Sequence, residues 1–250
     1  MLLLKLGKYI NFKLLIKFLS MEAKKVVVTG ASKGIGFELV KNLSKNGHHV
    51  LAITRNKDSI INLQKDHKNI TVLELEITKE IDVNAIRDFV SSTWGNIDAI
   101  IHNAGKLIHK PFFKTSITDF MEVYKVNVFA VAELTKLLLP YVNKGGHVVG
   151  VSSMGGVQGS KKYAGLSAYT SSKGALITLF ELLAEEYFES GIAFNTLAIG
   201  AVQTEMLKRA FPGYKASISA AAMAEYIADF SLNKARYFNG KVIPVSNSTP

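Results

Sequence analysis

Hydrophobic and polar residues alternate along this chain in two patterns. Short runs of apolar, mostly β-branched residues, such as KVVVT at 25–29 and HVVGVS at 147–152, indicate strands buried on both faces. Between such runs, apolar residues recur at helical spacing, for example at Leu39, Val40 and Leu43. Because strands and helices alternate throughout, the pattern predicts a parallel sheet covered by helices on both faces.

The expected elements follow one another from residue 24 to residue 245. Strands are expected at 25–29, 49–54, 70–75, 97–102, 147–152, 192–198 and 241–245. Helices are expected at 37–45, 82–93, 119–141, 168–190 and 220–232. Residues 55–69 are expected to be a polar connection, and 200–217 a less regular segment. With right-handed crossovers, we predict a single α/β domain with a Rossmann-like, doubly wound parallel sheet of about seven strands.

Residues 1–20 differ from the rest of the chain. They contain no acidic residue and carry Lys5, Lys8, Lys13 and Lys17. These lysines interrupt every apolar run, so no stretch of about 20 apolar residues could span a membrane. No small-residue cleavage site marks a secretory signal. We expect residues 1–20 to be an N-terminal extension, either translated leader before a true start at Met21 or a poorly formed membrane-surface helix, and residues 21–250 to be a single domain.

Composition excludes several kinds of chemistry. The 250 residues include no cysteine, which excludes disulfides and thiol nucleophiles, and the six histidines show no metal-ligand spacing, so no metal site is predicted. The net charge is +10, of which +6 remains without residues 1–20. Outside that segment, basic and aromatic residues do not alternate in the way that nucleic-acid binding requires. An anionic small molecule is therefore the expected partner, and nucleic acid is not.

A glycine-rich turn, TGASKGIG at 29–36, joins the first expected strand to the first helix. Glycines let a pyrophosphate approach the backbone, and the helix N-terminus offers free N–H groups and a positive dipole end. A glycine cluster alone is a weak signal, but a position between a buried strand and a helix is typical of a dinucleotide site. The residues of this turn expected to bind the cofactor are Gly30, Ser32, Lys33, Gly34, Ile35 and Gly36.

The end of the second expected strand bears on the choice of cofactor. Folds that select NAD usually place an acid there, to bind the ribose diol. Here Thr54 stands at that position, and the guanidinium of Arg55, the next residue, can bind a 2′-phosphate. Lys33 adds a second cation on the same side. We predict NADP(H) as the cofactor; the alternative is that both cations are solvated surface groups.

Tyr169 and Lys173 are four residues apart on an expected helix, so they lie on one face, one turn apart. A free phenol has a pKa near ~10 and is a poor proton shuttle at neutral pH. A neighbouring ammonium favours the phenolate and should lower that pKa, which predicts a general acid/base for a carbonyl or alcohol oxygen. A serine at the adjacent strand end can hydrogen-bond the same oxygen. Taken alone, the pair also fits an ordinary amphipathic helix with a snorkelling lysine.

Five motifs in this order resemble the short-chain dehydrogenase/reductase family. They are TGxxxGxG at 29–36, HNAG at 102–105 where the family has NNAG, Asn127 within a helix, VSS at 151–153 and YxxxK at 169–173. The resemblance covers about residues 24–245. It implies hydride transfer between a nicotinamide cofactor and a carbonyl or alcohol, in a domain that binds the dinucleotide and carries out catalysis.

The resemblance also implies roles for individual residues. Lys173 holds the nicotinamide ribose as well, and Asn127 supports a bound water that leads protons to solvent. Ser153 is the implied catalytic serine, and Ser152 the alternative, because the separation from Tyr169 is longer than is common in the family. The additional residues are expected in the loop 155–165, beside the substrate. Further cofactor contacts are implied at Glu76, which replaces the usual Asp, and at Asn103, Ala104, Gly105, Tyr169, Lys173, Gly200, Val202 and Thr204.

These observations predict an NADPH-dependent carbonyl reductase, reversible as an alcohol dehydrogenase. A catalytically idle dinucleotide sensor or scaffold is the alternative. Met206, Leu207, Phe211 and Tyr214 fall where the family has its substrate lid, and they fit either a partly apolar substrate or packing. A 3-oxoacyl thioester, a sugar, a steroid and a small ketone all stay open as substrates. The resemblance implies a homodimer or homotetramer, and the missing export signal a cytoplasmic location.

Overall fold

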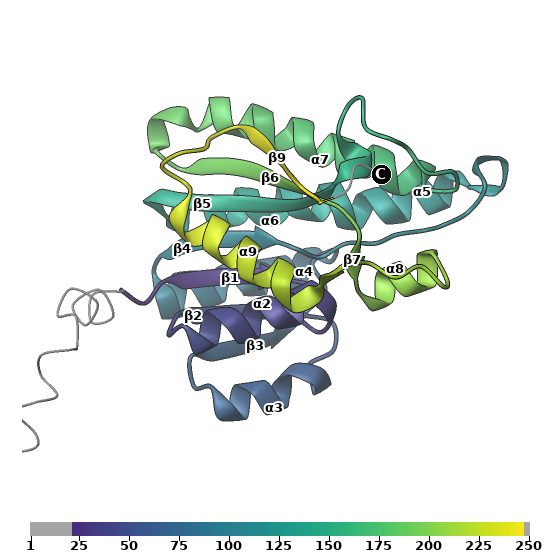
Figure 1. The fold of residues 1–250 in the computed structure, drawn as a ribbon. Coiled ribbons are helices and arrows are strands. Elements are labelled where there is room, and N and C mark those ends of the chain that lie inside the picture. The colour runs from purple at the N-terminus through teal and green to yellow at the C-terminus, as the bar shows by residue number, and fades with distance from the viewer. Residues whose placement is uncertain (1–21, 248–250) are drawn as a thin grey trace, which may run out of the picture.

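A computed structural model describes residues 22–247. Seven strands form one sheet in the order β3-β2-β1-β4-β5-β6-β9, and all neighbouring pairs are parallel (Figure 1). The strands are β1 Lys25–Thr29, β2 His49–Thr54, β3 Ile70–Glu74, β4 Ile97–His102, β5 Val142–Ser153, β6 Ala193–Ile199 and β9 Lys241–Val245. The order reverses between β1 and β4, which is the topological switch point of a doubly wound sheet. The predicted fold class is confirmed.

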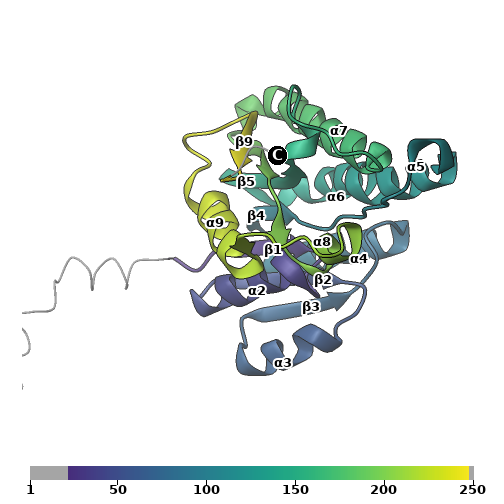
Figure 2. The same ribbon diagram turned by 45° about the vertical axis from the view of Figure 1, so that its right-hand side comes forward.

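Helices cover both faces of this sheet (Figure 2). On one face lie α2 Gly34–Lys45, α3 Asp58–Asp66 and α9 Ala220–Asn233; on the other lie α4 Glu80–Phe89, α6 Ala130–Leu138 and α7 Ser167–Glu186. The packing of β1 explains why its run of apolar residues is unbroken. Val26 and Val28 belong to the core on the α2 and α9 side, whereas Val27 belongs to the core against α4 and α6. Successive side chains point to opposite faces, so a strand covered twice must be apolar at every position.

The helix α3 lies inside the segment expected to be a polar connection. Of its nine residues only Ile60 is buried, while the following Ile61 is exposed. A helix that buries one side chain leaves almost no hydrophobic period in the sequence. The expectation of a polar connection was therefore wrong: α3 buries Ile60 and packs the partly buried Leu63 against the same core.

The long helix expected at 119–141 is divided into parts. A capping box between Ser116 and Asp119 begins α5 Ile117–Tyr124, and a π-helical turn Lys125–Phe129 separates α5 from α6. A 3₁₀ turn Leu139–Tyr141 follows. The π-helical turn contains the buried Asn127. A turn of this kind inside a helix frequently accompanies a functional site, because it redirects one side chain.

Two other segments are more regular than expected. Strand β5 begins at Val142, which pairs with Ile97, and a register shift before the pair Ala99 and His147 accommodates the glycines between them. The segment 200–217 contains β7 Val202–Gln203 and α8 Glu205–Ala210. β7 pairs with β8 Ile218–Ser219 in a small second sheet. Figure 1 shows α8 at the side of the molecule where the strands of the main sheet end.

Residues 1–20 and Met21 lie outside the described residues, so the expectations for the N-terminal extension and its start stay predictions. None of the helices that the structure describes is long and apolar enough to cross a membrane.

Candidate functional site

A cavity of about 490 Å³ opens at the carboxyl ends of the strands, where ligands bind in open α/β sheets. One part is lined by Gly30, 32–35, Arg55 and Glu76, and we call it the glycine-turn end. The other part is lined by residues from the end of β5, the loop before α7, α7 itself and α8, and we call it the tyrosine end. The lining side chains that define it are Ser153, Tyr163, Tyr169, Met206 and Phe211.

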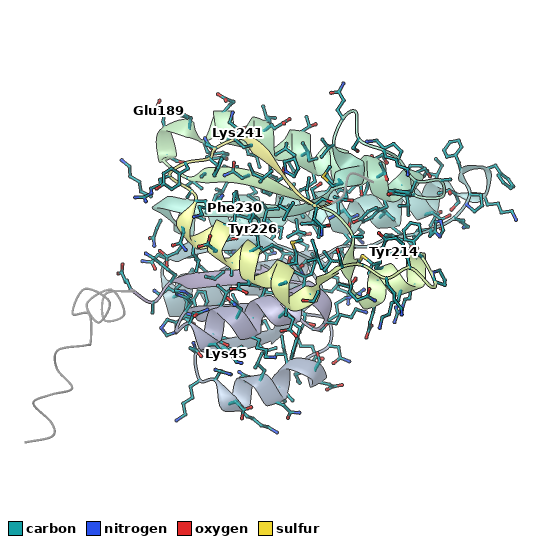
Figure 3. All side chains as sticks on the ribbon, in the orientation of Figure 1. Lys45, Glu189, Tyr214, Tyr226, Phe230 and Lys241 are labelled. Carbon is teal, nitrogen blue, oxygen red and sulfur yellow. The ribbon has the colours of Figure 1, made fainter. Side chains whose placement is uncertain are left out.

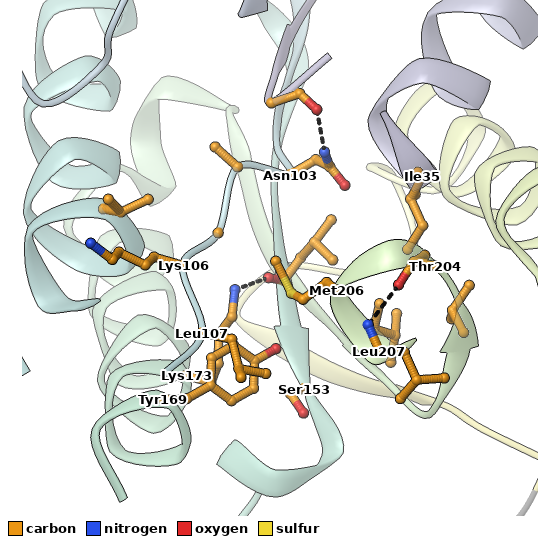
Figure 4. A pocket seen from close by; sticks show the side chains of 18 of the residues that line it. Ile35, Asn103, Lys106, Leu107, Ser153, Tyr169, Lys173, Thr204, Met206 and Leu207 are labelled. Carbon is orange, nitrogen blue, oxygen red and sulfur yellow. Dashed lines mark hydrogen bonds between the residues drawn. The ribbon is translucent and has the colours of Figure 1, made fainter. Parts of the chain in front are cut away.

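The glycine turn is packed so tightly that larger residues would not fit. A Cβ on Gly36 would lie 2.2 Å from the carbonyl oxygen of Gly30, and one on Gly30 would lie 2.8 Å from the Cα of Ala104. Asn103 fixes the turn, because its Nδ2 donates to the carbonyl oxygens of Thr29 (3.1 Å) and Gly30 (3.2 Å), as Figure 4 shows in part. The main chain of this turn is therefore held open toward the cavity.

The start of α2 suits a polyanionic group. Its N-cap residue Lys33 makes no side-chain capping bond, and the first turn contains no acidic residue. The first N–H groups and the positive end of the helix dipole are thus free to bind phosphate oxygens. Gly34, with φ +55°, and Ile35 line the cavity at this point, as does Ser32. The residues present fit a dinucleotide.

Two cations stand at the glycine-turn end. Arg55 is exposed, lines the cavity and forms no ion pair with any residue in the range 22–247. The Nζ of Lys33 lies 3.8 Å from a carboxylate oxygen of Glu205. At the end of β2 the Thr54 hydroxyl donates to the carbonyl oxygen of Asn56 (2.9 Å), so a hydroxyl occupies the place where an acid would bind a ribose diol.

Among the remaining predicted cofactor residues, Ala104, Gly105, Gly200 and Val202 also line the cavity, whereas Gly36 lies outside the lining. Glu76 lies beside them, but its carboxylate accepts from the Thr78 hydroxyl (3.0 Å) and lies 3.5 Å from Lys79 Nζ. Thr204 caps α8, since its Oγ1 accepts from the N–H of Leu207 (3.3 Å). The hydroxyl hydrogen of Thr204 is left free to donate to an anion.

At the tyrosine end, α7 brings Tyr169 and Lys173 one turn apart. Lys173 is buried, its Nζ donates to the carbonyl oxygen of Val151 (2.7 Å), and it lies 5.8 Å from the centre of the Tyr169 ring. Ser153 forms a hydrogen bond with Tyr169. Figure 4 shows Tyr169, Lys173 and Ser153 gathered at one place, where β5 ends beside α7.

The two neighbouring serines differ in what they contact. Ser152 is buried, and its hydroxyl donates to the main-chain oxygen of Lys173 (2.9 Å), so it ties β5 to α7. Ser153 is partly exposed, accepts from the N–H of Gly155 (3.2 Å) and bonds Tyr169. The geometry therefore brings Ser153, and not Ser152, to the hydroxyl of Tyr169.

Burial controls the protonation of this pair. It raises the pKa of Tyr169 to about 12, against the opposing effect of the hydrogen bond with Ser153. It lowers the pKa of Lys173 to about 8. The expectation that Lys173 lowers the pKa of the phenol is wrong in this structure, because loss of water around the phenolate outweighs the interactions that favour it. Tyr169 is therefore a neutral phenol at pH 7.

Asn127 connects the π-helical turn to the tyrosine end. Its Oδ1 accepts from the N–H of Lys106 (2.7 Å), and its Nδ2 donates to the Lys106 carbonyl (3.0 Å) and to the Ser172 hydroxyl (2.9 Å). Ser172 in turn donates to the main-chain oxygen of Tyr169 (2.7 Å). The sequence reasoning missed Ser172, although its place next to Lys173 within the YxxxK motif could have drawn attention to it.

Other cavity residues were missed as well, among them Glu205 and Leu107. Glu205 follows Thr204 directly, and its carboxylate lies 3.8 Å from the Nζ of Lys33, which also lines the cavity. An acid next to a predicted phosphate contact was a visible signal. Leu107 lines the cavity two residues after the NAG motif, and nothing in its local pattern marks it. His102 lies outside the lining: it is buried, its Nε2 lies 2.8 Å from the Thr135 hydroxyl, and burial lowers its pKa to about 3.

The fold and this site together define a dinucleotide-binding oxidoreductase. The short chain dehydrogenase family matches residues 24–215. The chain is also 31% identical over 196 residues to the 7alpha-hydroxysteroid dehydrogenase of Escherichia coli (strain K12), which covers 76% of this chain and 75% of that protein. The chain belongs to the short-chain dehydrogenase/reductase family. As a member it is an NAD(P)-dependent oxidoreductase that acts on CH–OH groups or the matching carbonyls.

Solved structures agree with the fold. A 3-ketoacyl-(acyl-carrier-protein) reductase from Brucella melitensis, complexed with NADH, is similar with a TM-score of 0.80 and 24% identity, over 92% of this chain and 99% of that chain. The protein ElxO, solved with NADP bound, is similar with a TM-score of 0.79 and 26% identity, over 90% of this chain and 98% of that chain. Both nicotinamide cofactors therefore occur among the similar structures.

Proposed function

We propose that this protein is an NADPH-dependent carbonyl reductase, reversible as an alcohol dehydrogenase, with Tyr169 as its general acid/base. One observation carries the proposal. The neutral phenol of Tyr169, bonded to Ser153, lies in the same cavity as a glycine turn whose N–H groups and cations suit a dinucleotide. A sensor or scaffold would need the glycine-turn end but not this pair.

In the direction of reduction, Tyr169 donates its hydroxyl proton to the carbonyl oxygen of the substrate. Ser153 holds that oxygen with a hydrogen bond. When bound, the reduced nicotinamide supplies a hydride to the carbonyl carbon, so the products are an alcohol and the oxidised cofactor. Because burial keeps Tyr169 protonated, the form that donates is the populated one at neutral pH.

Lys173 and Asn127 support this step. An ammonium has three donors, and one of those of Lys173 binds the Val151 carbonyl, so two remain for the nicotinamide ribose and for water. Asn127 holds the loop after β4 at Lys106 and, through Ser172, the helical turn of Tyr169. These contacts support the roles of ribose binding for Lys173 and of proton relay to solvent for the Asn127 region.

The preference for NADPH is supported by the cations at the glycine-turn end. Arg55 has no ion-pair partner among residues 22–247 and can bind a 2′-phosphate with a charge-assisted fork, while Thr54 offers no carboxylate to a ribose diol. The similarity to ElxO, solved with NADP bound, is in line with this proposal. The residues proposed to hold the cofactor are Gly30, Ser32, Lys33, Gly34, Ile35, Gly36, Arg55, Glu76, Asn103, Ala104, Gly105, Tyr169, Lys173, Gly200, Val202 and Thr204.

Titration of nicotinamide fluorescence with NADPH and with NADH tests the proposal. For Arg55→Ala we expect the Kd for NADPH to rise about 10- to 100-fold, the range of a lost charge-assisted bond, and the Kd for NADH to change little. Arg87→Ala is the matched control, because Arg87 pairs with Asp88 on α4 and lies outside the cavity lining. Equal affinity for the two cofactors in the unaltered protein would overturn the NADPH assignment. Binding without any ketone reduction would favour the sensor.

A homo-oligomer is proposed from the exposed side chains on neighbouring helices. Ile117 and Met121 on α5, Phe129 beside it and Leu182 on α7 are exposed, and a second copy of the chain would remove this apolar surface from water. Light scattering of the purified protein distinguishes a monomer from a homodimer or homotetramer. The single domain at 21–250 and the cytoplasmic location are likewise proposed on the sequence alone.

A further inference from the structure

The tyrosine end is walled by apolar side chains from segments that are far apart in the sequence. Leu107 comes from the loop after β4, Tyr163 from the loop between β5 and α7, and Met206 and Phe211 from α8 and the residue that ends it. Figure 4 looks into this end, with Leu107 and Met206 drawn around Tyr169. A substrate whose reacting oxygen reaches Tyr169 must therefore place its body against hydrocarbon.

Phe211 lies between two other rings. Its ring centre is 5.2 Å from that of His109 and 6.0 Å from that of Tyr163, and we call these three residues the aromatic clasp. Gly165 permits the close approach, because a Cβ there would lie 2.5 Å from His109 Cδ2. The N–H of Lys110 also donates to the Gly165 carbonyl (2.9 Å), which holds the two loops together. The clasp thus fixes two flat rings in the wall.

Apart from Lys173, which lies beside Tyr169, the charged groups that line the cavity near the tyrosine end are directed elsewhere. Glu205 faces Lys33 at the glycine-turn end. Lys106 pairs with Glu122, and Figure 4 shows it pointing away from Tyr169. Neither charge is therefore placed to hold a charged substrate group at the reacting carbon.

Polar side chains are also few there. Asn103 is the only amide among the described lining residues, and it is bound to the glycine turn. Apart from Ser153 and Tyr169, the hydroxyls near the tyrosine end belong to Ser152, which is bonded to the Lys173 carbonyl, and to Thr170, Tyr163 and Tyr214. Figure 3 shows Tyr214 beside α8. Tyr163 and Tyr214 are exposed, so few of these hydroxyls are buried partners for the hydroxyls of a polyhydroxylated substrate.

We propose that the site takes ketones and secondary alcohols with a rigid, ring-bearing hydrocarbon body, and that Phe211, held in the aromatic clasp, sets this preference. The inference rests on the proposed function, since it places the carbonyl oxygen of the substrate at Tyr169 and Ser153. The hydrocarbon rings then pack on Phe211 and Tyr163, where flat apolar surfaces gain most from contact. The reaction itself is unchanged: one hydride reaches the carbon and one proton reaches the oxygen.

Steady-state oxidation of NADPH by the full chain tests the inference with three ketones: cyclohexanone, the fused two-ring 2-decalone, and dihydroxyacetone. We expect kcat/KM to be at least about tenfold higher for 2-decalone than for cyclohexanone, and lowest for dihydroxyacetone. In Phe211→Ala, KM for 2-decalone should rise about tenfold with kcat nearly unchanged, while KM for cyclohexanone should change less than about threefold.

Two further variants make the test specific. Phe211→Leu keeps an apolar group without a flat ring, so it should give an intermediate KM for 2-decalone and protects the test if Phe211→Ala fails to fold. Phe188→Ala is the matched control, because Phe188 is an exposed phenylalanine after α7 outside the cavity lining. An equal loss of activity on all ketones in both Phe211 variants would overturn the role of Phe211.

The outcomes separate the two proposals. If dihydroxyacetone is the best of the three ketones while turnover depends on Tyr169, the substrate class is overturned and the reductase stands. If none of the ketones is reduced in a Tyr169-dependent manner, the reductase itself is overturned, and the substrate class with it.

Discussion

The two ends of the cavity are built in different ways. At the glycine-turn end the ligand would meet main-chain groups, held by glycines that tolerate no Cβ and by the amide of Asn103. At the tyrosine end it would meet side chains, which four separate segments contribute around Tyr169. The first end is determined by a short local motif, and the second by tertiary packing. This difference explains how one fold can keep its cofactor while it changes its substrate.

Of all the variants, Tyr169→Phe is expected to have the largest effect. It should impair the chemistry at the tyrosine end and leave the glycine-turn end intact. Removal of the hydroxyl takes away the proton donor, so kcat for ketone reduction should fall about 10²- to 10⁴-fold, the usual range for a general acid. The Kd for NADPH, measured by fluorescence, should rise by no more than about threefold, because Tyr169 is only one of the many proposed cofactor contacts and the glycine-turn end is untouched. Tyr226→Phe on α9, labelled in Figure 3, loses a hydroxyl outside the cavity lining and serves as control. Full activity in Tyr169→Phe would place the chemistry elsewhere.

The pH dependence of kcat/KM for ketone reduction tests the protonation states of Lys173 and Tyr169 at the tyrosine end. Since burial lowers the pKa of Lys173 to about 8, its ammonium is present below that pH and is lost above it. Tyr169, with its pKa raised to about 12, keeps its proton over the same range. We expect kcat/KM for reduction to be level near pH 7 and to fall about tenfold per pH unit above 8.

Lys173→Arg tests whether Lys173 is the group whose loss of a proton lowers kcat/KM above pH 8. A guanidinium stays charged, so the break near pH 8 should disappear even where the absolute rate is lower. A break that persists in the arginine variant would show that another group titrates, and Lys173 would lose this role.

Glu205→Gln is expected to have the smallest effect, and it acts at the glycine-turn end. The change removes a carboxylate that competes with phosphate for Lys33, so the Kd for NADPH should fall about two- to threefold. The effect is small because both side chains are exposed and water screens the pair. Glu189→Gln, an exposed acid after α7, is the control in the same fluorescence titration. Weaker binding in Glu205→Gln would mean that the pair orders Lys33 for the cofactor.

Sequence reasoning recovered the elements that carry a strong local signal. The positions of the strands along the chain follow from apolar runs such as 25–29, because a strand buried on both faces can contain little else. α3 gave no such signal, since Ile60 alone is buried, and the π-helical turn at Asn127 depends on contacts with Lys106 that are distant in sequence. The spacing of apolar residues along the sequence cannot predict either α3 or the π-helical turn.

The candidate site shows the same difference between residues with a local sequence signal and features that depend on tertiary packing. The glycine turn and the pair of Tyr169 and Lys173 were predicted at the positions where the structure brings them to one cavity. The direction of the Tyr169 pKa shift was not predicted correctly, because it depends on how much water the folded chain excludes. The contact of Phe211 with His109 joins residues about a hundred positions apart and has no local pattern.

The outer strand β9 also affects how copies of the chain can associate. The carbonyl of Val245 accepts from the N–H of Gly200, so Val245 faces the sheet and the preceding Pro244 faces outward. Proline has no N–H to offer, so a strand of another molecule added to this edge would lack a hydrogen bond at Pro244. Continuation of the sheet from one copy of the chain into another is therefore disfavoured at the outer edge of β9.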